Sequence, residues 1–323
     1  MKIGVIGAGG WGTTLANLLS GKNDVTLWVR EKELFDILTK EKENKLFLPG
    51  VTLSDNLKYS NDPESMKQFE VVLFAVPSQY MRATAKMFSS IISPESIIVT
   101  VSKGIELATY KRMDQILREE LNNDKIIALS GPNHCEEVGR KIPTATVIAS
   151  DNPEILEKIR GSFETDYFRV YTHDDIIGVE ICGAIKNITA IATGVVAGLG
   201  FGDNATGSII TYGLTEMNKF GRFFGAKQKT IYGLAGVGDL VATCTSKHSR
   251  NRFVGKKIAE GKSFEEIKDE MHGMVAEGVL TTKSVYEFSR QNNIDMPLTK
   301  QVYKVLFEKK ELKKAISDLI RLI

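Results

Sequence analysis

Short hydrophobic runs alternate with amphipathic segments along the first half of the chain. Runs rich in Val, Ile, Leu and Phe occupy residues 2–6, 24–29, 70–76, 96–102, 125–130 and 144–150. Nearly continuous hydrophobicity over such short runs is typical of strands in a parallel sheet that is covered on both faces. Apolar residues at helical spacing fill the stretches between them, at 11–19, 32–40, 81–91 and 110–121. The pattern predicts a Rossmann-type, doubly wound α/β domain.

The strand patterns stop at about residue 170. Residues 179–197, 205–224, 279–291 and 298–308 have the apolar spacing of helices. A chain of 323 residues is long for one core, because domains commonly hold about 100 to 200 residues. We therefore expect an α/β domain over residues 1–178 and an all-α domain over residues 179–323.

Composition excludes several classes of function. The chain has 42 basic and 40 acidic residues, so its net charge of +2 gives no reason to expect binding to nucleic acid or to an anionic membrane. Its cysteines, Cys135, Cys182 and Cys244, are far apart, and its four histidines form no H-E-x-x-H pattern, so we expect no metal site. A secretory signal is not evident, and the longest uncharged run, 187–202, is too short and glycine-rich to span a bilayer. We expect a cytoplasmic protein without membrane insertion that binds small molecules.

Gly7, Gly9 and Gly12 form a G-x-G-x-x-G motif directly after the first predicted strand. In a Rossmann turn these glycines permit a tight turn, admit a pyrophosphate and allow close packing of strand and helix, while the helix N-terminus favours negative charge. A glycine-rich turn without a ligand is the alternative. The position between a strand and a helix favours a dinucleotide.

Arg30 and Glu31 follow the second predicted strand, where the residue that reads the ribose of a dinucleotide is expected. An acidic residue there binds the ribose hydroxyls of NAD, whereas an arginine suits the 2′-phosphate of NADP. Arg30 favours NADPH as the cofactor, with NADH as the alternative. Alternatively, Arg30 and Glu31 are an ordinary exposed pair at the start of a helix.

Two lysines have surroundings that suit catalysis. Lys103 is the only cation in the loops 75–79, 101–106 and 129–138, which follow predicted strands and should delimit one crevice beside the dinucleotide. Lys186 lies beside Asn187 among small and apolar residues, where burial would lower its pKa toward the range useful for proton transfer and Asn187 could orient a substrate oxygen. A solvated loop lysine and a lysine that extends to the helix surface are the alternatives.

Residues 249–252, with the sequence SRNR, precede an apparent helix. Backbone N–H groups, the Ser249 hydroxyl and the Arg250 guanidinium can together bind a phosphate there. Asp239, in the stretch GVGDL, can hold a nearby catalytic cation. A solvated basic turn is the alternative interpretation of SRNR.

Nine stretches, in order along the chain, resemble the NAD(P)-dependent glycerol-3-phosphate dehydrogenase family, particularly its bacterial members. They are GAGGWGTTLA, NKLFLPG, FAVPSQ, SKGIE, SGPNHCEEV, IKNITAI, GFGDNATGSIITYGLTEM, GLAGVGDLVATCTSKHSRNRFVG and VAEGVLTTKSV. The resemblance spans both predicted domains. It implies reversible, NAD(P)H-dependent reduction of dihydroxyacetone phosphate to sn-glycerol 3-phosphate for phospholipid synthesis, and a homodimer.

The resemblance also implies roles for individual residues. Lys186 matches the family's catalytic lysine, which donates a proton to the ketone and accepts it in the reverse reaction. Lys103 matches a second active-site lysine, and Asp239 matches the acidic residue that supports both lysines. Substrate contacts are implied for Lys103, Gly131, Asn133, Lys186, Asn187, Asp239, Ser249, Arg250 and Asn251, with the phosphate held by Arg250 and Asn251. Cofactor contacts are implied for Gly7, Gly9, Gly10, Trp11, Gly12, Arg30, Glu31, Phe47, Lys103, Cys135, Arg250, Val275 and Glu277.

Several positions depart from the family pattern. Gly10 replaces a common serine, Cys135 replaces alanine, and Asn133 stands where bacterial members usually carry Ser or Thr and eukaryotic members Asn. Arg30 is followed by Glu31 instead of a second basic residue or histidine.

Two other functions remain as alternatives. Another β-hydroxyacid or 6-phosphogluconate-type dehydrogenase would share the fold and a catalytic lysine, but SRNR and GLAGVGDL disfavour it. A non-catalytic NADPH-binding sensor is disfavoured because the chain retains Lys103, Lys186, Asp239 and Arg250 together.

Overall fold

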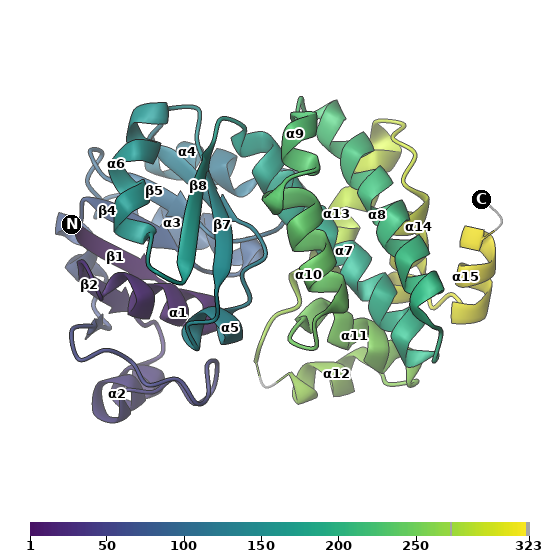
Figure 1. Ribbon diagram of the computed structural model, residues 1–323, viewed down its shortest axis with the longest axis horizontal. Helices are drawn as coiled ribbons and strands as arrows, with labels where there is room; N and C mark the ends of the chain where they lie inside the picture. Colours follow the sequence, from purple (N-terminus) through teal and green to yellow (C-terminus); the bar gives the residue numbers. More distant parts are fainter. Residues whose placement is uncertain (272, 321–323) are drawn as a thin grey trace. The chain divides into compact units, whose positions relative to one another are not determined.

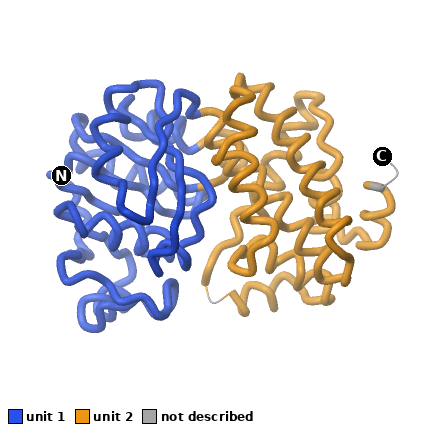
Figure 2. Tube along the Cα trace, viewed as in Figure 1, with its two compact units in different colours: residues 1–102, 113–176 blue, residues 103–112, 177–323 orange. Residues whose placement is uncertain are grey.

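Residues 1–271 and 273–320 are described by a computed structural model, in which the chain forms two compact units (Figure 2). Unit 1 contains Met1–Ser102 and Met113–Ile176, and unit 2 contains Lys103–Arg112 and Ile177–Ile323. The expected division at residues 178 and 179 lies two residues from the boundary between 176 and 177. It differs in the segment 103–112, which belongs to unit 2 although the sequence analysis placed it in the first domain.

Unit 1 is built on an eight-stranded sheet within the described residues, with strand order β3-β2-β1-β4-β5-β6-β7-β8 (Figure 1). The six predicted runs coincide with strands of this sheet, which confirms the α/β class. The core side chains Ile3, Val5 and Leu73 are fully buried, and burial of such a side chain contributes about 1.5–3 kcal/mol. The strands are β1 (Lys2–Ile6), β2 (Asp24–Trp28), β3 (Lys58–Ser60), β4 (Val71–Phe74), β5 (Ile97–Thr100), β6 (Ile126–Ser130), β7 (Thr144–Ala149) and β8 (Phe168–His173).

The expectation of an entirely parallel sheet is wrong at one pair. β6 and β7 are antiparallel, with Ser130 opposite Val147, whereas the other neighbouring strands are parallel. A parallel crossover usually needs a helix that spans the sheet, and the connection between β6 and β7 holds only the five-residue helix α5 (Cys135–Gly139). The end of β6 therefore lies beside the start of β7.

The four helices predicted for the first half of the chain lie close to helices of unit 1, whereas the helical segments at 63–68, 78–80 and 153–163 were not predicted. Tyr110, the first residue of the predicted helix 110–121, lies outside the observed helix because its backbone is left-handed, with φ 58°; that helix begins at Met113. The helical segments are α1 (Gly10–Leu19), α2 (Lys32–Glu41), η1 (Pro63–Gln68), η2 (Ser78–Tyr80), α3 (Met81–Phe88), α4 (Met113–Leu121) and α6 (Pro153–Phe163).

Unit 2 is all-α over its described residues, as expected (Figure 1). Its central helix α7 is long and apolar enough to cross a membrane, but 89% of its most apolar window is buried inside the protein. Helix α11 packs closely on α7, because a Cβ at Gly255 would lie 1.9 Å from the carbonyl oxygen of Ile191. The helices are α7 (Ile176–Gly198), α8 (Asp203–Phe223), α9 (Gln228–Ile231), η3 (Leu234–Gly238), α10 (Asp239–Thr245), α11 (Arg250–Ala259), α12 (Phe264–Glu270), α13 (Glu277–Gln291), α14 (Pro297–Phe307) and α15 (Leu312–Ile320).

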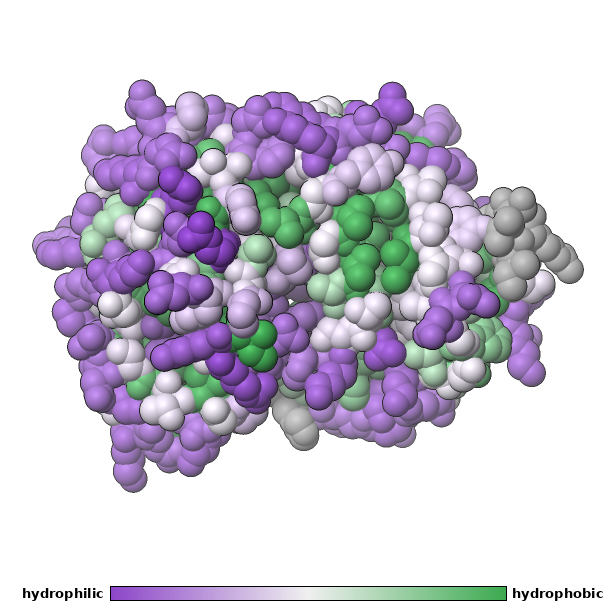
Figure 3. All heavy atoms as spheres, viewed as in Figure 1, coloured by the Kyte–Doolittle hydropathy of each residue, from purple (hydrophilic) through white to green (hydrophobic). Residues whose placement is uncertain are grey.

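The surface of unit 2 carries exposed hydrophobic side chains. Figure 3 shows a hydrophobic area over α8 and α10 on the face in view. Val241 of α10 is 42% exposed, and Phe223, the last residue of α8, and Phe201, two residues before α8, are also exposed. Contiguous apolar areas of this kind are found where proteins associate.

Candidate active site

The glycine motif forms an open turn at the N-terminus of α1. Gly7 has φ +109°, a conformation that favours glycine. A Cβ at Gly12 would lie 2.0 Å from the carbonyl oxygen of Gly7, so this position excludes any side chain. A Cβ at Gly9 would meet nothing within 4 Å, which leaves room for a ligand against the backbone. These residues fit a dinucleotide, whose pyrophosphate is favoured at a helix N-terminus.

Gly10 and Cys135, two positions that depart from the family pattern, lie next to each other at this turn. A Cβ at Gly10 would lie 3.0 Å from the Cys135 Sγ and 2.6 Å from the carbonyl oxygen of Phe47. Asn44 holds the Phe47 segment in place, since its amide donates to the carbonyl of Ala8 at 2.9 Å and its Oδ1 accepts from the Phe47 N–H at 3.1 Å. The sequence analysis did not single out Asn44, although it lies within NKLFLPG.

Arg30 and Glu31 form an ion pair directly after β2. The Arg30 Nε donates to a Glu31 carboxylate oxygen at 2.8 Å, and their side chains are 68% and 49% exposed. A ligand phosphate would therefore compete with Glu31 for this guanidinium. Trp11 packs its indole against Phe168 of β8, with ring centroids 6.4 Å apart.

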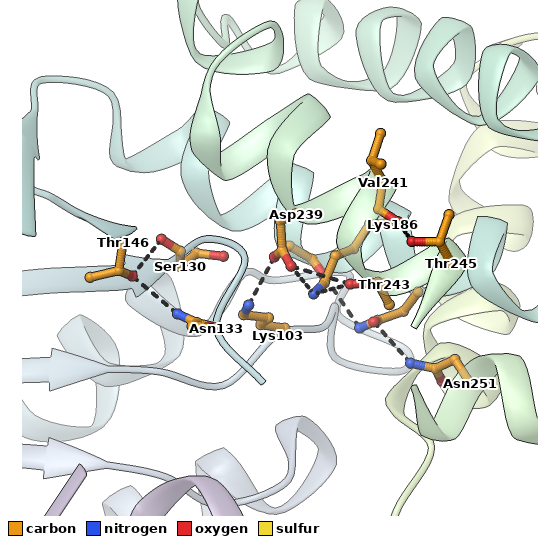
Figure 4. Close-up of polar contacts among 12 residues, drawn as sticks. Lys103, Ser130, Asn133, Thr146, Lys186, Asp239, Val241, Thr243, Thr245 and Asn251 are labelled. Atoms are coloured by element: carbon orange, nitrogen blue, oxygen red, sulfur yellow. Dashed lines mark hydrogen bonds and ion pairs between the residues drawn. The ribbon is translucent and has the colours of Figure 1, made fainter. Parts of the chain in front are cut away.

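Gly131 and Asn133 follow β6 in unit 1. Gly131 has φ +146°, and the Asn133 Nδ2 donates to the Thr146 hydroxyl at 3.0 Å (Figure 4). Thr146 is fully buried in β7. The antiparallel pairing of β6 with β7 thus places Thr146 against Asn133. Asn133 is an expected substrate contact, whereas the sequence analysis did not single out Thr146.

Lys103, Lys186 and Asp239 form a buried charge cluster in unit 2 (Figure 4). The Lys103 Nζ lies 2.8 Å from one oxygen of Asp239, and the Lys186 Nζ contacts the other. The Thr243 hydroxyl, one turn along α10 from Asp239, accepts from the Lys186 Nζ at 2.8 Å. Lys186 is buried instead of extending to the helix surface, and Lys103, in the loop that follows β5, belongs to unit 2.

Burial sets the protonation of this cluster. Desolvation lowers the pKa of Lys186 to about 7, although the negative charge of Asp239 opposes the change and the positive charge of Lys103 adds to it. Desolvation also opposes ionisation of Asp239, but the charges of Lys103 and Lys186 outweigh it and lower the pKa of that carboxyl. Lys186 can therefore give up or accept a proton near neutral pH, whereas Asp239 stays ionised.

A second polar cluster in unit 2 surrounds the start of α11. Ser249 is the N-cap, and its Oγ accepts from the Arg252 N–H at 3.2 Å. The buried Asn251 donates from Nδ2 to Asn187 Oδ1 at 2.9 Å, while its own Oδ1 accepts from the Gly278 N–H at 2.9 Å. Both amide oxygens are thus engaged within the protein. The amide N–H groups that remain suit an anion.

The other expected residues occupy unit 2 as well. Arg250 is exposed at the first position of α11, Glu277 is the first residue of α13, and Val275 precedes it. Their expected contacts with the cofactor stay predictions. Across residues 1–271 and 273–320, no group of three or more His, Cys, Asp or Glu side chains is arranged to hold a metal ion.

Two family models match the chain. The model described as the NAD-dependent glycerol-3-phosphate dehydrogenase N-terminus matches residues 2–156, and the model described as the C-terminus of the same family matches residues 175–317. Together they cover both units.

Relatives and solved structures agree with these models. The chain is 47% identical to a protein named glycerol-3-phosphate dehydrogenase [NAD(P)+] from Chlorobium phaeobacteroides, over 99% of this chain and 97% of the relative. It resembles the crystal structure of glycerol-3-phosphate dehydrogenase from Coxiella burnetii with a TM-score of 0.94 and 36% identity, covering 99% and 98% of the two chains. The yeast Saccharomyces cerevisiae enzyme of the same name is 30% identical with a TM-score of 0.84, covering 98% and 99%.

Proposed function

Because this chain belongs to the NAD-dependent glycerol-3-phosphate dehydrogenase family and is an NAD(P)-dependent oxidoreductase, we propose that it interconverts dihydroxyacetone phosphate and sn-glycerol 3-phosphate. The buried cluster of Lys103, Asp239 and Lys186 carries this proposal. It combines Lys186, whose pKa is about 7, with the positive charge of Lys103. The reduction of a ketone to an alcohol needs a proton for the oxygen and a positive charge beside that oxygen, and the two lysines can supply them.

Lys186 is proposed as the proton donor and acceptor. A nicotinamide cofactor held at the glycine turn would supply the hydride for the carbonyl carbon. The Lys186 Nζ gives its proton to the carbonyl oxygen, and in the reverse direction the neutral amine takes the alcohol proton. A pKa of about 7 populates both forms, so one side chain serves both directions. Asp239 holds Lys186 in place, and Lys103 stabilises the negative charge that develops on the oxygen.

The proposed phosphate site is formed by Ser249, Arg250 and Asn251 at the start of α11 and by Asn187 of α7. The engaged amide oxygens leave N–H donors, and the helix N-terminus favours an anion. Gly131 and Asn133 are proposed as further substrate contacts. Loss of a charge-assisted hydrogen bond in Arg250→Ala should raise KM for dihydroxyacetone phosphate about 10- to 100-fold. Lys256→Ala, an exposed cation on the same helix, is the matched control; equal KM values in both variants would argue against the site.

NADPH is the proposed cofactor, with NADH as the alternative. The guanidinium of Arg30 would leave Glu31 and bind the 2′-phosphate. Arg30→Ala should then raise KM for NADPH and leave KM for NADH unchanged, whereas Lys32→Ala, an exposed lysine of α2, should change neither. If Arg30→Ala affects both cofactors alike, Arg30 does not read the 2′-phosphate.

One assay separates the proposal from its rivals. NADPH absorbance is followed with dihydroxyacetone phosphate and NADPH, with 6-phosphogluconate or short hydroxyacids and NADP⁺, and with each form of the cofactor without substrate. Oxidation with dihydroxyacetone phosphate alone supports the proposal, and activity with the other substrates favours a different dehydrogenase of this fold. Tight NADPH binding without turnover of any substrate favours the non-catalytic sensor.

We also propose a cytoplasmic homodimer that supplies glycerol 3-phosphate to phospholipid synthesis. The hydrophobic area over α8 and α10 offers a surface for a second copy (Figure 3). Light scattering should give twice the chain mass of 35.7 kDa. A mass equal to one chain at all concentrations would refute the dimer.

A further inference from the structure

The Thr146 hydroxyl bridges two residues at the end of β6. It donates to the carbonyl oxygen of Ser130 at 3.0 Å and accepts from the Asn133 Nδ2 at 3.0 Å (Figure 4). Thr146 is fully buried, so water does not compete for these bonds. The bridge exists because β7 runs antiparallel to β6, which places the start of one strand at the end of the other.

This bridge decides which way the Asn133 amide faces. A hydroxyl has one hydrogen, and that hydrogen is used by the Ser130 carbonyl, which can only accept. Thr146 must therefore act as the acceptor toward Asn133, and only the NH₂ end of the amide can donate to it. The Asn133 Oδ1 is consequently turned away from Thr146.

Thr146 also shapes the turn that precedes Asn133. A Cβ at Gly131 would lie 3.2 Å from the Thr146 Cα and 3.3 Å from its Oγ1. The backbone at Gly131 has φ +146°, which any other residue rarely adopts. Thr146 thus packs against one expected substrate contact and orients another.

We propose that Thr146 is a positioning residue for substrate recognition, acting through Asn133. By holding the NH₂ end, it directs the Asn133 Oδ1 toward the free hydroxyl of the three-carbon substrate. An amide oxygen accepts a hydrogen bond from a hydroxyl but has no proton to offer a phosphate, so this end of the amide reads the hydroxyl end of the molecule. The inference rests on the proposed function, because it takes dihydroxyacetone phosphate as the substrate.

The experiment compares Thr146→Val, which keeps the branched shape and loses the hydroxyl, with Thr146→Ser, which keeps the hydroxyl. We expect Thr146→Val to raise KM for dihydroxyacetone phosphate about tenfold, the size of one lost hydrogen bond to an orienting group, with kcat little changed. Thr146→Ser should restore a KM near that of the wild type. Thr26→Val, at a buried threonine of β2, is the matched control for replacing a buried strand threonine and should leave KM unchanged.

Two further measurements separate positioning from a general structural effect. Hydroxyacetone phosphate lacks the free hydroxyl, so its KM should be the same for Thr146→Val and the wild type. In an Asn133→Ala background, Thr146→Val should add nothing to KM. The affinity for NADPH, measured by fluorescence without substrate, should stay constant in all variants.

Several results would overturn the inference. An equal rise of KM for both ketones, or the same rise with and without the Asn133 side chain, would assign Thr146 a purely structural role. If Thr146→Val does not fold, Thr146→Ala carries the same expectations. A wild type that turns over dihydroxyacetone phosphate while Asn133→Ala keeps a normal KM refutes this inference alone, whereas a wild type without that activity refutes the proposed function.

Discussion

Replacing Asp239 by asparagine removes the negative charge that Lys103 and Lys186 share. Lys103 lies 2.8 Å from one carboxylate oxygen and Lys186 contacts the other. At a charge separation of about 4 Å and an effective dielectric of about 20, one such pair is worth about 4 kcal/mol, or about three pKa units. Even a third of this effect lowers the pKa of Lys186 by about one unit.

The consequence for catalysis follows from the direction of that shift. Burial lowers the pKa of Lys186 to about 7, even though the negative charge of Asp239 raises it. In Asp239→Asn the ammonium form therefore disappears at lower pH, and a shift of one to two units reduces its population at pH 7 about 5- to 50-fold. Reduction of the ketone needs this protonated form, so its alkaline limb should move to lower pH by about the same one to two units.

The assay is the pH profile of kcat/KM for dihydroxyacetone phosphate between pH 5 and 9. Asp295→Asn makes the same chemical change in an exposed ion pair with Lys219 and should leave the profile unchanged. Asp239→Asn should also destabilise the fold by about 3–5 kcal/mol, because it leaves buried charge uncompensated. An alkaline limb that stays in place, or moves to higher pH, in a folded Asp239→Asn protein would refute the reasoning.

Three other substitutions test separate parts of the molecule. Lys186→Met should nearly abolish turnover yet leave NADPH binding intact by fluorescence titration; retention of most activity would remove Lys186 from the reaction. Gly10→Ser should weaken dinucleotide binding and cost about 1–3 kcal/mol in the free energy of unfolding, since its Cβ would crowd Phe47 and Cys135; unchanged affinity and Tm would contradict this. Burial raises the pKa of Glu216 from 4.5 to about 7. The contribution of Glu216 to stability is therefore fully present below pH 4.5 and is lost as pH rises through 7, which lowers the free energy of unfolding by about 3 kcal/mol. Glu216→Gln should therefore gain stability relative to the wild type between pH 5 and 8 in chemical unfolding, and a constant difference would refute that linkage.

The main features of unit 1 were predictable because its strands are nearly continuous apolar runs. β8 (Phe168–His173) was missed since its buried and exposed positions alternate, as expected for the last strand of a sheet, and the sequence analysis relied on continuous hydrophobicity. β3 (Lys58–Ser60) is only three residues long and polar, so no periodicity reveals it. β7 was predicted as a strand, but its antiparallel direction was not, because hydrophobicity does not encode strand direction.

The site residues were predicted from motifs, residue types and the family resemblance, whereas the partners of these residues depend on tertiary structure. Thr243 follows Asp239 by one helical turn and contacts Lys186, and Thr146 of β7 contacts Asn133 in the loop after β6. Buried threonines are common in cores, so nothing in the local sequence marks these two. The placement of Lys103 in unit 2 was equally hidden, because a loop after a strand gives no sign of the unit with which it packs.

The chain enters unit 2 twice, and this has a consequence for fragments and for synthesis. A fragment that starts at residue 177 contains Lys186 and Asp239 but lacks Lys103, and it lacks the Ile105 carbonyl that accepts from the Ser284 hydroxyl at 3.0 Å. The helical half is therefore not an independent module that can be excised or transplanted with its chemistry. On the ribosome, residues 103–112 emerge long before their partners, so the charge cluster can assemble only after the chain beyond residue 239 has been made.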